Sequence, residues 1–270
     1  MALDENWLVQ FCSPEISRSE VLRDTLVELG YTPCQIQTGP WNHWQSKNGL
    51  PLAGELVLVA HYDRQPGTPG ANDNSASVFH LLNYLARSTE RSSHRVIFTD
   101  GEEVFGERPA SMQGARLLGD FWKSVHRVPR VVVLDMCGIG DTFVLGHLSE
   151  HLKAGIGLAD DPATKALRLW TRRLLAGTDA GDFIEIDTPF SDDLGFLWSG
   201  IPAVQISLLP RKQALKYQKE RKNNPMESSL PEAWRTMHTS QDLPERLWPQ
   251  SKILLQKLLD RIDQLPYRPG

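Results

Sequence analysis

The chain has 270 residues, of which 40% are hydrophobic and 23% charged, with a formal charge of -4 and a pI near 6.1. This composition predicts one globular domain over residues 1–270, and the lack of a basic surplus argues against a nucleic-acid partner. The acidic residues Asp4 and Glu5 and the absence of a long apolar run near them predict a cytoplasmic protein without a membrane partner, for which a peptide or small-molecule substrate fits best.

The predicted elements begin with a helix between Pro14 and Leu29, which has apolar residues at helical spacing and ends before Gly30. Short β-rich runs follow, several of them continuously apolar, as is typical of strands covered on both faces. These runs are PCQIQT (33–38), GELVLVAHYD (54–63), HRVIFTDGEE (94–103), RVVVLDMCG (130–138), DTFVLGH (141–147) and PAVQISLLP (202–210).

Segments with helical patterns separate these runs. Helices are expected over residues 74–87, 110–125, 162–175 and 251–265. The alternation of strands and helices predicts a layered αβα domain.

One polar, mostly basic tract interrupts this alternation between Arg211 and Ser229. We expect a solvated surface loop there. The alternative is a lid or rim beside the active-site cleft that favours acidic substrates, because the tract lies close in sequence to His238.

The cysteines Cys12, Cys34 and Cys137 are odd in number, widely spaced and without a CxxC pair. This pattern predicts reduced thiols in the core and neither a disulfide framework nor a cysteine-based zinc site.

Acidic and imidazole side chains cluster where the predicted strands end. His61 and Asp63 follow one apolar run, Glu102 and Glu103 follow the next, and Asp135 follows VVVL. Asp73 stands at the entry to a helix, and His238 lies in WRTMHTSQD. Because ligands gather beyond the carboxyl ends of strands in an open α/β sheet, these residues are expected to converge. Imidazole and carboxylate groups without thiolates suit zinc or a similar divalent ion, and a bridging carboxylate would allow two ions.

At this point the sequence resembles the co-catalytic zinc aminopeptidases, whose relatives include glutamate carboxypeptidases and glutaminyl cyclases. The resemblance rests on HYD, GANDN, DGEE, a strand ending in Asp, SD before a short helix and a Gly-Ile-Pro strand, and HTxxD, in that order from His61 to Asp242. It implies a three-layer αβα sandwich with a central mixed, mostly parallel sheet.

The resemblance also implies a role for each site residue. His61 and Asp135 would bind one Zn2+, Glu103 and His238 a second, and Asp73 would bridge both, although a single ion is possible. Glu102 would be the general base, and Asp63 would orient the imidazole of His61. The peptide bond between Asp73 and Asn74 is expected to be cis, as it often is in this family.

The resemblance further implies a zinc-dependent aminopeptidase that hydrolyses N-terminal residues of peptides, and two rival functions accompany this prediction. The first is a single-zinc, glutaminyl cyclase-like acyltransferase, which would need an aromatic-walled pocket that Trp41, Trp44, Trp198 or Trp234 could supply. Met237 stands where cyclases place a tryptophan before the metal histidine, which favours hydrolysis. The second is a non-catalytic binding protein on the same fold, against which the complete ligand set argues. Asp193 replaces the histidine of the SDH pattern common in aminopeptidases, and this departure bears on substrate contacts.

Overall fold

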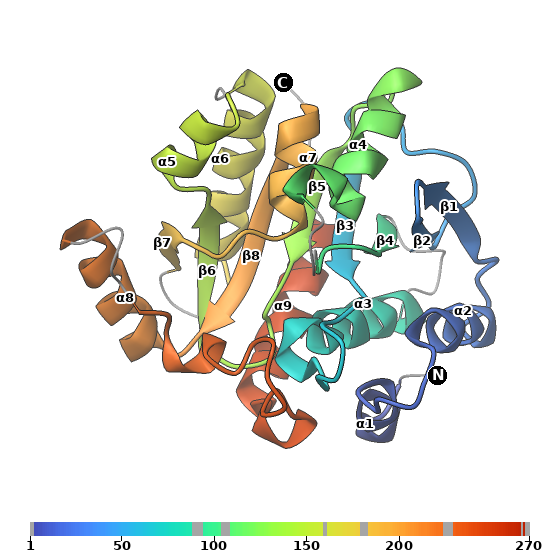
Figure 1. Cartoon of the computed structure of the whole chain (residues 1–270), viewed down its shortest axis with the longest axis horizontal. Helices are drawn as coiled ribbons and strands as arrows, with labels where there is room; N and C mark the ends of the chain where they lie inside the picture. Colours follow the sequence, from blue (N-terminus) through green and yellow to red (C-terminus); the bar gives the residue numbers. More distant parts are fainter. Residues whose placement is uncertain are drawn as a thin grey trace.

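The fold is built on one mixed sheet in a computed structural model that describes residues 3–87, 94–103, 109–158, 161–178, 183–223, 229–265 and 267. Within the described residues, eight strands form one sheet in the order β1-β2-β4-β3-β5-β8-β6-β7 (Figure 1). Their bounds are β1 Cys34–Thr38, β2 Trp41–Gln45, β3 Leu56–His61, β4 Arg95–Thr99, β5 Arg130–Leu134, β6 Thr142–His147, β7 Ile184–Asp187 and β8 Ala203–Leu209.

The centre of the sheet is parallel and its edges are mixed. β4, β3, β5 and β8 pair in parallel, and so do β6 and β7. β6 runs antiparallel to β8, and β2 runs antiparallel to both β1 and β4. The predicted mixed, mostly parallel sheet is therefore confirmed.

Helices cover both faces of the sheet, as the predicted three-layer sandwich requires (Figure 1). Side chains of α2, α3, α6 and α9 pack on one face, and those of α4 and α7 pack on the other. The bounds of the α-helices are α1 Glu5–Phe11, α2 Arg18–Glu28, α3 Ala76–Arg87, α4 Gly114–Ser124, α5 Glu150–Gly155, α6 Pro162–Ala176, α7 Asp192–Ser199, α8 Arg211–Asn223 and α9 Pro249–Gln264. Short turns of helix occur at η1 Ala71–Ser75, η2 Ala110–Met112, η3 Glu232–Trp234 and η4 Pro244–Arg246.

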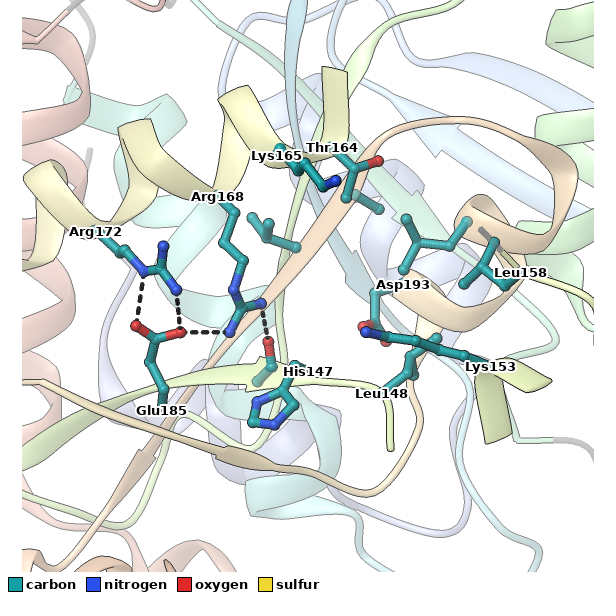
Figure 2. A pocket seen from close by; sticks show the side chains of 14 residues that line it. His147, Leu148, Lys153, Leu158, Thr164, Lys165, Arg168, Arg172, Glu185 and Asp193 are labelled. Atoms are coloured by element: carbon teal, nitrogen blue, oxygen red, sulfur yellow. Dashed lines mark hydrogen bonds and ion pairs between the residues drawn. The ribbon is translucent and has the colours of Figure 1, made fainter. Parts of the chain in front are cut away.

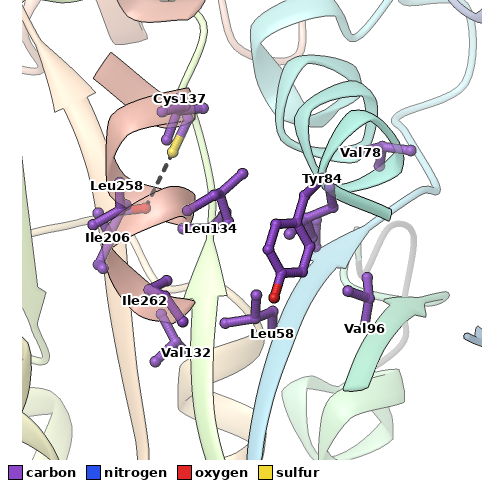
Figure 3. Packing of buried hydrophobic residues seen from close by; sticks show 14 of the residues in the cluster. Leu58, Val78, Tyr84, Val96, Val132, Leu134, Cys137, Ile206, Leu258 and Ile262 are labelled. Carbon is purple, nitrogen blue, oxygen red and sulfur yellow. Dashed lines mark hydrogen bonds between the residues drawn. The ribbon is translucent and has the colours of Figure 1, made fainter. Parts of the chain in front are cut away.

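The two layers of core follow from the period-2 alternation of the buried strands. In β3, Leu58 and Ala60 face the α3 and α9 side, whereas Val57 and Val59 face the α4 and α7 side. All of these side chains are fully buried. Figure 3 shows Leu58 in the first layer with Val132 and Leu134 of β5 and with Ile262 of α9. Continuous apolar runs thus mark strands covered on both faces, as expected.

Some elements escaped the sequence analysis. α1 and α5 are short, β2 contains only polar and aromatic residues, and β7 spans four residues, two of which are charged. The sequence of β7 alternates the buried residues Ile184 and Ile186 with Glu185 and Asp187. This alternation could have predicted the strand.

The predicted surface loop from Arg211 to Ser229 is wrong for its first thirteen residues, which form α8. Residues 224–228 lie outside the described residues. The α8 segment is rich in Lys, Arg and Gln, which are good helix formers. Ala214 and Tyr217 bury its inner face, and the Tyr217 ring meets the Trp234 ring edge-on at 5.8 Å. None of the described helices is long and apolar enough to span a membrane.

A buried arginine that the sequence analysis did not single out ties α2 to the sheet. Arg18 is 6% exposed. Its guanidinium donates to the carbonyl oxygens of Phe11, Tyr62, Asp63, Pro69 and Gly70 and to the hydroxyl of Ser75. Burial and the nearby charge of Arg64 lower the pKa of Arg18 to about 10. The arginine therefore stays charged and fixes the loop that leads into α3.

We expect Arg18→Leu to lower the free energy of unfolding by about 3 kcal/mol or more, because each buried carbonyl left without a donor costs about 1–3 kcal/mol. Arg23→Leu on the same helix is the matched control. Arg23 is exposed and, among the described residues, pairs only with Asp24, so its change should stay within about 0.5 kcal/mol. Urea unfolding of both variants measures the difference, and equal losses would show that the Arg18 contacts do not stabilise the fold.

Candidate metal centre

Three neighbouring parallel strands deliver most of the predicted site residues. His61 is the last residue of β3, Glu102 and Glu103 follow β4, and Asp135 follows β5 directly. Because β4, β3 and β5 are adjacent and parallel, their carboxyl ends meet at one edge of the sheet. The predicted convergence of these four residues is present in the structure.

Two further residues of the set, Asp73 and His238, come from outside the sheet. Asp73 lies in the irregular turn η1 before α3, and its peptide bond to Asn74 is cis, as expected. His238 lies between η3 and η4 in a left-handed backbone conformation, with φ of 62°. Its side chain is 44% exposed, whereas that of Asp73 is 6% exposed. The site is thus closed on the sheet side and open beside His238.

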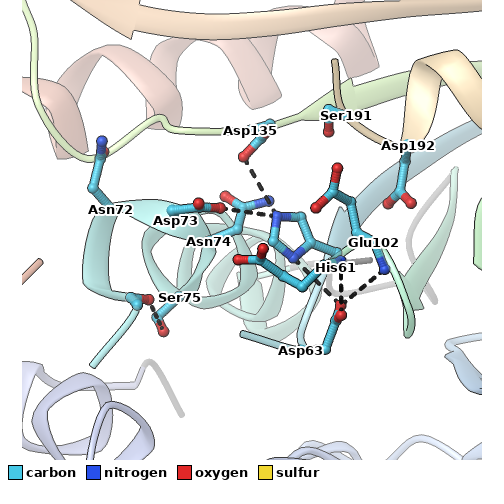
Figure 4. A network of polar contacts seen from close by, with 12 residues as sticks. His61, Asp63, Asn72, Asp73, Asn74, Ser75, Glu102, Asp135, Ser191 and Asp192 are labelled. Atoms are coloured by element: carbon cyan, nitrogen blue, oxygen red, sulfur yellow. Dashed lines mark hydrogen bonds and ion pairs between the residues drawn. The ribbon is translucent and has the colours of Figure 1, made fainter. Parts of the chain in front are cut away.

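Asp73 connects two groups of side chains. Its Oδ1 lies 3.1 Å from His61 Nε2, and its Oδ2 lies 3.3 Å from His238 Nε2. Asp135 Oδ1 completes the first group at 3.6 Å from His61 Nε2, and Glu103 Oε2 completes the second at 3.0 Å from His238 Nε2. In each group the three candidate ligand atoms lie within 4.8 Å of one another. Figure 4 shows Asp73 and Asp135 around the His61 ring.

Asp63 contacts the first group at the ring nitrogen of His61 that faces away from Asp73. Its Oδ1 lies 3.4 Å from His61 Nδ1, on the side of the ring away from Asp73 (Figure 4). The same carboxylate accepts the backbone N–H groups of Glu102 at 3.3 Å and Glu103 at 3.0 Å. A carboxylate behind a histidine fixes the orientation of its ring and raises its basicity. Asp63 therefore aligns the end of β3 with the turn after β4.

The turn that carries both glutamates is also held by Trp41. A Cβ atom on Gly101, whose φ is 74°, would lie 2.3 Å from the Trp41 ring, so only glycine fits there. The Trp41 indole donates to the carbonyl of Met112, and the Trp44 indole donates to Ser19. Both tryptophans are buried in β2, so their contribution is packing.

The donor atoms of the cluster suit a divalent cation. Both nitrogens of His61 and Oδ1 of Asp135 are buried without a hydrogen-bond partner among the described residues. No described Lys or Arg forms an ion pair with Asp73, Glu103 or Asp135. Buried carboxylates without a cation are costly, and imidazole nitrogen with carboxylate oxygen is a donor set that zinc takes. The residues present therefore fit Zn2+.

Electrostatics within the cluster point the same way. The carboxylates of Asp73 and Glu103 raise the pKa of His238 to about 10. Burial opposes ionisation of both Asp73 and His61. Even so, the facing imidazoles lower the pKa of Asp73. The facing carboxylates of Asp135, Asp63 and Asp73 raise the pKa of His61. The cluster thus stabilises positive charge between its carboxylates.

Glu102 differs from Glu103 in its partners. Burial raises the pKa of Glu102 well above its usual range, and the nearby carboxylates of Glu103 and Asp135 add to this effect. Its Oε1 accepts from Gln113 Nε2 at 3.3 Å, and the same amide donates to the carbonyl of Ser191 at 3.2 Å. Gln113 is fully buried at the start of α4 and was not predicted, because no local pattern distinguishes it.

The SDD segment at the start of α7 places two further carboxylates near the cluster. Asp192 is fully buried, lies beside Glu102 and accepts a hydrogen bond from the Thr99 hydroxyl (Figure 4). Asp193 accepts from the backbone of Ser191. Burial raises the pKa of each to about 7.

A small cavity of about 120 Å³ opens onto the cluster. Besides the site residues, Gln65 and four apolar residues line it: Met136, Pro189, Phe190 and Met237. No tryptophan and no residue of α8 is among the described lining residues. Trp234 is buried in the core instead, and Trp198 stacks on Arg116.

Asp242, the last residue of HTSQD, holds the backbone at Asp73. Its Oδ1 accepts from the backbone N–H of Asn72 at 2.8 Å, and its Oδ2 accepts from that of Asp73 at 3.0 Å. Asp242 belongs to the HTxxD motif, but no role was predicted for it. The HTxxD motif could have indicated this role, because it places the Asp242 carboxylate four residues after His238.

We expect Asp242→Ala to weaken metal binding, because the backbone of Asp73 is no longer held. The expected loss of affinity is about 10- to 100-fold, the usual effect of removing a residue that positions a metal ligand. Titration with a competing chelator measures the affinity. Asp24→Ala, at an exposed position, is the control and should bind metal like the unchanged chain. Unchanged affinity in Asp242→Ala would show that Asp73 is positioned without it.

Comparison with known proteins gives one family match. A family model described as peptidase family M28 matches residues 43–257, a range that contains all seven predicted site residues. A search of curated proteins finds no match.

Solved structures with a similar fold include a zinc aminopeptidase and a glutaminyl cyclase. The Legionella pneumophila protein LapA has a TM-score of 0.62 at 17% identity, over 97% of this chain and 65% of LapA. The Tannerella forsythia glutaminyl cyclase has a TM-score of 0.63 at 15% identity, over 98% and 96% of the two chains. BSAP, a zinc aminopeptidase from Bacillus subtilis, has a TM-score of 0.52 at 17% identity, over 84% of this chain and 50% of BSAP. The chain thus spans less than two thirds of the length of LapA and half that of BSAP.

Proposed function

The chain belongs to peptidase family M28, and from this premise we propose that it is a zinc-dependent aminopeptidase that removes N-terminal residues from peptides at a binuclear metal site. The observation that carries the proposal is the position of Asp73. Its two carboxylate oxygens face separate histidine and carboxylate pairs, so one side chain can serve two ions.

The ligands divide between the two ions by proximity. His61 and Asp135 would hold one zinc ion, Glu103 and His238 would hold the other, and Asp73 would contact both. Bound zinc would polarise the scissile carbonyl and make water a nucleophile near neutral pH.

Glu102 is the proposed general base. It lines the cavity beside the ligands, while Gln113 fixes one of its carboxylate oxygens and Asp63 holds its backbone. In this position the carboxylate can take a proton from the attacking water and deliver it to the leaving amine. The adjacent glutamates thus divide two tasks, with Glu103 as ligand and Glu102 as base.

A glutaminyl cyclase-like acyltransferase with one zinc ion is the second candidate, favoured by the near-complete mutual coverage with the Tannerella forsythia cyclase. Cyclisation of an N-terminal glutamine requires that the substrate amine outcompete water. The flexible side chains of Met136 and Met237 beside the cluster, and the absence of tryptophan from its described lining, support hydrolysis instead.

A paired assay separates the two candidates. The zinc-loaded protein is offered aminoacyl chromophores and, separately, a peptide with N-terminal glutamine, with a chelator-treated sample as control. Chelator-sensitive release of the chromophore is the expected result. Cyclisation without release would transfer the assignment to the acyltransferase, and neither activity in a metal-loaded sample would favour a binding protein.

A further inference from the structure

A second cavity of about 400 Å³ is separate from the cavity at the metal cluster, and we call it the basic pocket. It lies between α5, α6, β6 and the start of α7, and it shares no lining residue with the cavity at the metal cluster. Its charged walls are Lys153, Lys165, Arg168, Arg172, Glu185 and Asp193 (Figure 2). Its volume falls in the range of small-molecule sites.

The described walls of the basic pocket carry more positive than negative charge. Four cationic side chains face two carboxylates, although the chain as a whole carries -4. Glu185 is shared, because it accepts from Arg168 at 2.7 Å and from Arg172 at 2.7 and 3.0 Å. One carboxylate therefore holds both guanidinium groups, and their combined charge exceeds its own.

The arginines are held in place before any ligand arrives. Arg168 also donates to the carbonyl of Gly146 at 2.8 Å, so its guanidinium is fixed from two sides. Figure 2 shows this pair of contacts at one end of the pocket and Lys153 with Asp193 at the other. Fixed guanidinium groups lose little conformational entropy when they bind an anion.

Lys165 is the least satisfied cation of the set. It is exposed on the first turns of α6 and forms no ion pair or side-chain hydrogen bond with any described residue. Its ammonium group can thus meet a ligand without giving up a native contact. Leu148, Leu158 and Leu197 supply an apolar wall for the uncharged part of such a ligand.

From these contacts we infer that the basic pocket binds a small molecule carrying a multiply charged oxyanion group, either a phosphoryl group or several carboxylates. Arg168, Arg172 and Lys165 receive the oxyanion, and the leucines receive the body of the molecule. Planar guanidinium groups suit phosphate and carboxylate oxygens. The inference does not depend on the reaction at the metal cluster.

Calorimetric titration of the zinc-loaded protein with inorganic phosphate, glycerol phosphate and citrate tests this inference. We expect binding of at least one of the three in the unchanged chain. Lys165→Met should weaken that binding and Lys165→Glu should weaken it further, by at least tenfold. Lys219→Glu, an exposed position on α8 with the same change of net charge, should bind like the unchanged chain.

The results also identify the chemical source. Binding of glycerol phosphate without citrate would assign a phosphate ester, and the reverse would assign a polycarboxylate. Equal affinity in all variants would place the anion elsewhere, for example on the zinc ions, and would overturn the inference. No binding by any of the three probes at millimolar concentration would overturn it as well.

Discussion

Replacing Glu102 with glutamine is expected to leave both zinc ions bound and to lower kcat by roughly 10²- to 10⁴-fold, the range for a general acid–base group. The side chain lines the cavity but belongs to neither group of candidate ligands. Glutamine keeps its shape and cannot accept the proton of the attacking water. The defect should therefore appear in kcat with little change in KM.

The adjacent residue provides the comparison for this variant. Glu103→Gln changes a candidate ligand that lies 3.0 Å from His238, so it should reduce the zinc content as well as activity. Zinc content and steady-state kinetics of the two variants are measured together. Equal loss of zinc in both would contradict the division of roles between the two glutamates.

Replacing Asp73 with alanine should have the largest effect on the metal centre. Each of its oxygens faces a different group, so the variant removes one candidate ligand from each group. We expect zinc affinity to fall by more than the roughly 10- to 100-fold typical of losing a partner behind a ligand, and turnover to fall with it. Metal content after dialysis and chromophore release report the two losses.

His238→Ala distinguishes a bridge from an ordinary ligand. This variant removes a ligand from one group only, so we expect it to keep about one zinc ion per chain by the geometry of the two groups. If Asp73→Ala kept as much zinc as His238→Ala, the bridging role of Asp73 would be contradicted. Circular dichroism of both variants shows whether the fold is retained.

The sequence predicted the site because its residues lie where strand ends must converge. His61, Glu103 and Asp135 each follow an apolar run, and adjacent parallel strands bring such ends together. Neither Asp73 nor His238 follows a strand, so their assignment as bridging and terminal ligands depended on the family resemblance. Their roles as ligands, like the single domain and the cytoplasmic location, remain predictions.

The residues that the sequence did not indicate act through long-range contacts. Arg18 and Gln113 donate to backbone carbonyls far along the chain, those of Pro69 and Ser191. No local periodicity encodes such contacts. The α8 helix was missed for a different reason, since its inner face shows only Ala214 and Tyr217 in an otherwise polar segment.

The most direct test of the binuclear centre is the zinc content of the purified chain, measured by elemental analysis after dialysis against metal-free buffer. Two zinc ions per chain are expected, from the two groups that share Asp73, with loss of peptide hydrolysis when a chelator removes them. One ion per chain would contradict the binuclear site. Hydrolysis that persists without metal would contradict the proposed mechanism as a whole.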